Sequence, residues 1–118
     1  MSNAGDTDGL TGQEIAVVGM AGRFPGAAGV EEFWRNLREG RDCITRYSDE
    51  ELLAAGVSRE DLADPGYVRA SGALDGIELF DAAFWGLAPR EAAVMNPQHR
   101  LFLECAWEGL EDAGYVTL

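Results

Sequence analysis

Residues 80–115 read FDAAFWGLAPREAAVMNPQHRLFLECAWEGLEDAGY, and the second half of this stretch is a well-marked helix. The side-chain oxygen of Asn96 can accept hydrogen bonds from the free backbone N–H groups of a first turn. Pro97 then takes the first helical position, where a missing N–H costs nothing. Gly114 suits a left-handed C-terminal cap. The spacing i, i+3, i+4, i+7 predicts one apolar face: Leu103, Ala106, Trp107 and Leu110. Three glutamates lie mostly off that face: Glu104, Glu108 and Glu111.

A dense apolar segment precedes this helix. It contains Phe80, Phe84, Trp85 and Leu87, and Pro89 then opens a short helical piece over residues 89–95. Large aromatic side chains at this density pack into an interior in most proteins. We therefore expect a helical layer with an aromatic plug.

Residues 15–18 read IAVV and are followed by Gly19. An apolar run without alternation, rich in β-branched residues, predicts a strand that is buried on both faces. The loop at residues 19–26 is glycine-rich, but its glycines do not make the G-x-G-x-x-G spacing and no G-K-[ST] follows. Dinucleotide binding is therefore disfavoured.

The remaining segments alternate helices and turns. The apolar spacing at residues 30–39 predicts an amphipathic helix that ends at Gly40: Val30, Phe33, Trp34 and Leu37. Ser48 and Glu51 have the spacing of a capping box, and Ser58 can start another turn. Residues 67–74 are expected to be extended. Residues 1–13 are polar and aperiodic, which predicts a disordered leader or an expression tag.

Composition narrows the class of protein. Of 118 residues, 47% are hydrophobic and 25% are charged, as in ordinary soluble domains. A net charge of −12 argues against nucleic-acid and anionic-membrane partners. No run is long enough to span a bilayer, and we expect a cytoplasmic protein. Cys43 and Cys105 lack metal-ligand spacing, and a disulfide is not expected in a reducing compartment.

Two stretches of the sequence resemble the ketosynthase (β-ketoacyl synthase) domains of modular polyketide synthases. The first is I-A-V-V-G-M-A-x-R-F-P-G near the N-terminus, and the second is F-D-x-x-F-[FW]-G-[IL]-x-P-R-E-A-x-x-M-[DN]-P-Q-x-R-L-x-L-E-x-A-W-E-x-L-E-D-A-G. The resemblance implies an α/β, thiolase-like fold. Residues 14–118 would form only its N-terminal portion, with one buried strand, several helices and an incomplete sheet.

The resemblance also implies a chemistry. The family joins an acyl chain to a malonyl-type unit by decarboxylative Claisen condensation, using a cysteine nucleophile and two histidines. Its substrates are carried on the phosphopantetheine of an acyl carrier protein, and its members are homodimers. The T-A-C-S-S-S-type motif is absent from these residues, and neither cysteine nor His99 matches a catalytic position. We assign no catalytic, cofactor-binding or metal residue, and expect this chain alone to be inactive.

A single strand cannot satisfy its own backbone groups. Either the chain is part of a larger ketosynthase, with the remainder of that domain as its partner, or it is a non-catalytic docking or dimerisation module derived from one. An unrelated nucleotide-binding fragment is the third and disfavoured alternative. Downstream residues discriminate between the first two.

Overall fold

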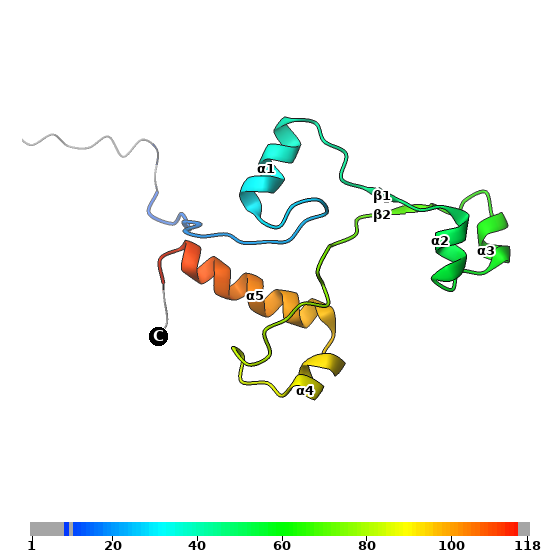
Figure 1. Cartoon of the computed structure of the whole chain (residues 1–118). Helices are drawn as coiled ribbons and strands as arrows, with labels where there is room; N and C mark the ends of the chain where they lie inside the picture. The colour runs from blue at the N-terminus through cyan, green and yellow to red at the C-terminus, as the bar shows by residue number, and fades with distance from the viewer. Residues whose placement is uncertain (1–8, 10, 116–118) are drawn as a thin grey trace, which may run out of the picture.

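The structure is a computed structural model that describes residues 9 and 11–115. Its elements follow in chain order: α1 (Val30–Arg38), β1 (Thr45–Arg46), α2 (Asp49–Ala54), α3 (Arg59–Ala63), β2 (Ala70–Ser71), α4 (Pro89–Val94) and α5 (Pro97–Asp112). In Figure 1, α1, α4 and α5 form a body, and an arm that carries β1, β2, α2 and α3 projects from it. Nine of the thirteen residues assigned to the leader, 1–8 and 10, lie outside the described residues.

The two ends of α5 match the prediction from sequence. The Asn96 side chain accepts a hydrogen bond from the Gln98 N–H at 2.9 Å, and Pro97 is the first helical residue. At the other end Gly114 has a positive φ of 78°. The N–H groups of Gly114 and Tyr115 donate back to Glu111 and Leu110. This pair of bonds satisfies carbonyls that the helix end would leave open.

Helix α1 packs against the loop that precedes it. The Phe33 ring stacks on the Phe24 ring with centroids 4.1 Å apart. One turn further, the buried Asn36 donates its side-chain N–H to the Gly26 carbonyl at 2.9 Å. The predicted end at Gly40 is confirmed by its φ of 64°. Only half of the predicted apolar face is covered, because Trp34 and Leu37 remain exposed.

The arm is held together by its own polar contacts. Strands β1 and β2 pair antiparallel, with Thr45 opposite Ser71 and Arg46 opposite Ala70. The predicted capping box of Ser48 and Glu51 is present at the start of α2. Arg69 donates to the Asp49 carboxylate at 2.5 Å and to the Leu62 carbonyl at 2.7 Å, so it ties β2 to both helices.

An aromatic cluster joins the segment before α4 to α5. The Trp107 ring lies edge-on to Phe84 at 5.0 Å and to Trp85 at 6.2 Å. Of the predicted α5 face, Trp107 lies in this cluster and Leu103 is half-buried. Ala106 and Leu110 of the same face are exposed.

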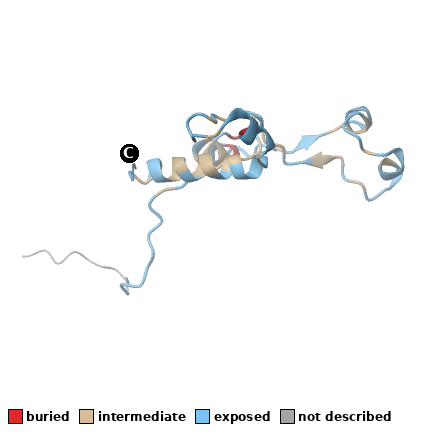
Figure 2. Ribbon diagram, turned by 90° about the horizontal axis from the view of Figure 1, so that it is seen from below, coloured by how far each residue is buried: buried red, intermediate tan, exposed pale blue. Residues whose placement is uncertain are grey.

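Burial is sparse across the described residues. The buried hydrophobic residues there are Ala27 and Ala92, and no large side chain is fully buried. In Figure 2 the buried residues lie in the body, and none lies in the arm. The strand predicted as buried at residues 15–18 is instead exposed, at 94% for Ile15, 78% for Val17 and 61% for Val18. It belongs to no sheet among the described residues, because no neighbouring strand or covering layer reaches it.

Candidate functional site

The loop of residues 19–26 is fixed onto α5 by an ion cluster. The Arg23 guanidinium donates two parallel hydrogen bonds to the Glu108 carboxylate, at 2.7 and 2.5 Å. Glu104, one turn earlier on α5, lies 4.0 Å from the same guanidinium. Bidentate pairs of this kind restrict orientation as well as distance. The cluster therefore sets how the N-terminal segment approaches the helix.

This contact changes the titration of both partners. The hydrogen bonds from Arg23 lower the pKa of Glu108. The same bonds to Glu108 raise the pKa of Arg23, against the opposing effect of desolvation. Both groups are therefore held in their charged forms at neutral pH.

The glycines of the loop serve packing within the chain. A Cβ on Gly19 would lie 2.6 Å from the Gly109 carbonyl oxygen and 2.7 Å from the Ala113 nitrogen, so this backbone touches the backbone of α5. A Cβ on Gly22 would meet the Phe24 ring at 2.7 Å. Protein atoms therefore occupy the positions where a Cβ would lie at both glycines. The adjacent Met20 N–H donates to the Asp112 carboxylate at 2.9 Å.

We expect the Arg23 and Glu108 pair to contribute about 1 kcal/mol of coupling in a double-mutant cycle with R23M and E108Q, since partial exposure screens the charges. The folded pKa of Glu108 is depressed. The coupling should therefore be fully present above the unfolded pKa and lost as pH falls through the folded one. Unfolding free energies from denaturant titration of the complete domain would measure it.

The more exposed pair of Arg41 and Glu39 is the matched control for that cycle. Its coupling should be close to zero, because exposed ion pairs contribute little. Equal coupling in the two pairs, or a coupling at Arg23 that does not change on acidification, would contradict the interpretation.

Two apolar surfaces lie open beside this fixed loop. One is the segment 15–18 described above. The other runs along α5, where Phe102, Ala106 and Leu110 are spaced by one turn and all are exposed. The open surface therefore consists of a strand-like segment and one stripe of α5.

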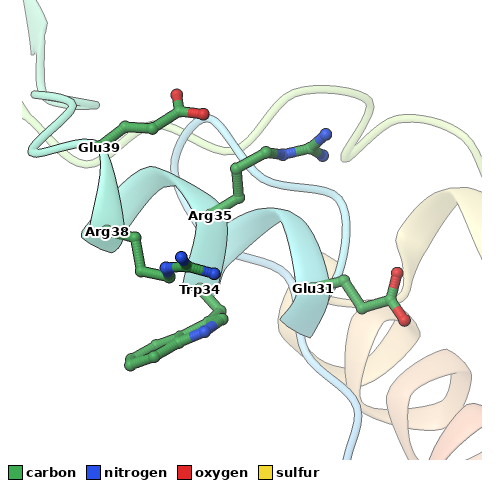
Figure 3. A pocket seen from close by; sticks show the side chains of 5 residues that line it. All are labelled: Glu31, Trp34, Arg35, Arg38 and Glu39. Carbon is green, nitrogen blue, oxygen red and sulfur yellow. The ribbon is translucent and has the colours of Figure 1, made fainter.

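The outer side of α1 carries a further exposed aromatic residue. Trp34 is 59% exposed. It lines a shallow hollow with charged residues of both signs: Glu31, Arg35, Arg38 and Glu39. Figure 3 shows these side chains projecting from α1 and its C-cap in different directions, with Arg38 beside Trp34. An exposed aromatic residue with charged neighbours is typical of a protein contact surface, and these side chains do not converge as catalytic groups would.

Both cysteines are free thiols in the structure. Cys43 is half-buried beside Gly26, with its Sγ 3.8 Å from the Arg41 carbonyl oxygen. Cys105 is half-buried on α5. His99 is exposed in the first turn of α5, where its N–H donates to the Asn96 carbonyl at 2.9 Å. In residues 9 and 11–115 no three side chains that could ligate a metal gather, and no helix is long and apolar enough to cross a membrane.

Sequence reasoning missed the ion cluster. Arg23 and Glu108 are 85 residues apart, so no local spacing connects them. The available signal was indirect. Arg23 interrupts a glycine-rich loop, and Glu104 and Glu108 lie one turn apart on the side of α5 away from the predicted apolar face.

The family comparison covers nearly the whole chain. Residues 12–117 match the sequence model described as the beta-ketoacyl synthase N-terminal domain. The chain is 62% identical over 100 residues to a component protein of the phenolphthiocerol/phthiocerol polyketide synthase of Mycobacterium tuberculosis, and the match covers 85% of the chain and 7% of that protein. It is 46% identical over 113 residues to polyketide synthase ThaG of Burkholderia thailandensis, and that match covers 90% of the chain and 2% of the relative.

Solved structures show the same likeness. Ketosynthase twelve of the bacillaene polyketide synthase from Bacillus amyloliquefaciens aligns with a TM-score of 0.70 and 43% identity, over 81% of this chain and 17% of that one. The ketosynthase from module 6 of the bacillaene synthase from Bacillus subtilis aligns with a TM-score of 0.71 and 40% identity, over 86% of this chain and 17% of that one. The predicted fold class is confirmed by these neighbours. The chain thus spans less than a tenth of the curated relatives and about a sixth of the solved chains.

Proposed function

Because the chain belongs to the β-ketoacyl synthase family and is the N-terminal part of a polyketide synthase ketosynthase domain, we propose that it supplies the opening structural layer of a condensing enzyme. The match of residues 12–117 to the family's N-terminal domain carries this proposal. The complete enzyme would join an acyl chain to a malonyl-type extender by decarboxylative Claisen condensation. Its two substrates would be thioesters on the phosphopantetheine of an acyl carrier protein, and it would act as a homodimer.

The proposed reaction divides into two steps. A cysteine thiolate outside this chain attacks the acyl thioester, releases the carrier thiol and becomes acylated. The extender then loses carbon dioxide, and the resulting enolate attacks the acyl-cysteine to form a carbon–carbon bond and regenerate the thiolate. Two histidines, also outside this chain, would stabilise the developing negative charge. The role of residues 14–118 is to support that site, and we expect no condensation from the chain alone.

A chimaeric ketosynthase tests the proposal. In it, the residues of this chain that align replace the matching segment of the ketosynthase domain of the mycobacterial relative. We expect the chimaera to accept a labelled acyl group from its carrier protein and to condense it with an extender. The isolated chain should do neither. A second chimaera, with the recipient's nucleophilic cysteine changed to alanine, is the matched negative control.

The outcomes separate the two functions that the sequence left open. Condensation by the chimaera supports the enzyme. A chimaera that folds and dimerises as the recipient does but neither loads nor condenses would overturn the proposal and favour the docking or dimerisation module. The exposed aromatic surface around Trp34 is the feature that suits such a module.

A further inference from the structure

We propose that helix α1 pairs antiparallel with α1 of a second copy of the complete domain, with Trp34 near the centre of the contact. The pair would join one ketosynthase homodimer to another. The inference therefore goes beyond the proposed function, which concerns the reaction. It gives a partner to the exposed side of α1 that the structure describes.

The exposed side of α1 carries an apolar stripe. Val30, Trp34 and Leu37 are spaced by four and three residues, which places them along one side of the helix. Trp34 is 59% exposed and Leu37 is 56% exposed. Another side of α1 is occupied by the contacts of Phe33 and Asn36 with the preceding loop. A large aromatic and an aliphatic side chain left in water gain free energy when a partner covers them.

The charged residues that border the stripe change sign along the helix, with acidic residues in the first turn and basic residues in the last. Glu31 and Arg38 are seven residues apart, close to two helical turns, so they lie on the same side of α1. Arg38 lies beside Trp34 (Figure 3). Among the residues that the structure describes, Glu31, Arg35 and Arg38 form no ion pair. Their charges are therefore free to meet a partner.

A second α1 in the antiparallel direction would satisfy these charges. When Glu31 of each copy lies opposite Arg38 of the other, the twofold axis passes midway along that spacing, between residues 34 and 35. Trp34 of each copy then meets Arg35 of the other, a pair that attracts by the cation–π interaction. An isologous contact makes each of these pairs twice. The helix is thus complementary to its own reversed copy.

The charge of this segment favours a second copy over a partner of one sign. Residues 30–41 contain three acidic and three basic residues, so the segment is neutral while the chain carries −12. Two acidic chains repel each other, and the repulsion is least where their neutral segments meet. A wholly acidic or basic partner would match one half of α1 only. A contact centred on a nine-residue helix is small, so we expect a weak and reversible association.

Charge reversal in the chimaeric ketosynthase tests the pairing, with sedimentation velocity over a range of concentrations as the measurement. The unchanged chimaera should pass from homodimers to larger assemblies as its concentration rises. E31R and R38E should each weaken this step about tenfold, because each places like charges opposite one another. The double variant E31R/R38E places opposite charges together again and should regain the association. W34A should weaken it about tenfold or more, as at other tryptophan-centred contacts.

A mixture of the two single variants isolates the contact. The E31R chain presents only arginines at the two positions and the R38E chain only glutamates, so a mixed pair is complementary at both ends. The mixture should associate although each variant alone does not. E60R is the matched control, because Glu60 is an exposed acidic residue in the first turn of α3, in the arm. It makes the same charge change as E31R and should not weaken the association.

Homodimers should persist in every variant, which shows that the variants fold. The inference is overturned if the unchanged chimaera never exceeds a homodimer or if E60R weakens assembly as much as E31R does. It is equally overturned if neither the double variant nor the mixture associates.

The two proposals fail in different ways. A chimaera that condenses but forms no larger assembly rejects the α1 pair and leaves the function intact. A chimaera that assembles through α1 but does not condense rejects the function and leaves the pair in place.

Discussion

The chain on its own is expected to show no cooperative thermal unfolding as a monomer, and to self-associate as its concentration rises. Ordering a residue costs about 1–2 kcal/mol in backbone conformational entropy alone. Burial of apolar surface must offset most of that cost. Here the buried hydrophobic residues of the described part are two alanines, and large apolar side chains such as Ile15, Trp34 and Phe102 stay exposed. The apolar surface that the chain buries by itself is too small to offset this loss of conformational entropy.

Far-ultraviolet circular dichroism during heating would test for cooperative unfolding, and sedimentation velocity at several concentrations would test for self-association. The matched comparison is the chimaeric ketosynthase, in which the same residues should melt together with the rest of the domain. A monomeric isolated chain with a sharp transition in dilute solution would contradict the expectation. The arm could still keep local order, because its contacts close within residues 45–71.

The parts of the fold that could be predicted from sequence are those governed by neighbours along the chain. Caps act over three or four residues, so Asn96 and Gly114 marked the ends of α5 and Ser48 marked the start of α2. Glycine after a helix indicates a left-handed residue, and Gly40 adopts one. These signals need no knowledge of the tertiary structure.

The parts that could not be predicted depend on contacts between distant segments. The period of α5 grouped Ala106 and Leu110 with Trp107, but only Trp107 meets the aromatic cluster. Periodicity identifies a face that can be buried and does not say which layer buries it. Similarly, the apolar run at 15–18 predicted a buried strand, but the segment is exposed, because no neighbouring strand covers it among the described residues. The pairing of β1 with β2 could not be predicted, because a strand of two residues is too short to show an alternating pattern in the sequence.

Adding a single methyl group is expected to lower the stability of the domain most at Gly19. Its φ is not in the left-handed region, so an alanine there would suffer no backbone strain. Its Cβ would nevertheless lie 2.6 Å from the Gly109 oxygen, 2.7 Å from the Ala113 nitrogen and 2.8 Å from the Ala113 Cβ. Two of these are backbone atoms of a helix and its cap, which cannot move aside as a flexible side chain would. Overpacking of this kind costs about 1–3 kcal/mol or more.

We therefore expect G19A to destabilise the chimaeric domain by about 3 kcal/mol in denaturant titration, and G19V by more, because the segment must lift from α5 and release the bond from Met20 to Asp112. G29A is the matched control, since a Cβ at Gly29 meets nothing within 4 Å and its φ of −164° is open to any residue. Its effect should stay near or below about 1 kcal/mol, a range set by the N-cap position. If G19A were as mild as G29A, the close backbone contact between the loop and α5 would be absent from the folded domain. The anchor that orients the segment at residues 15–18 would then have to lie elsewhere, with the Arg23 and Glu108 pair as the next contact to test.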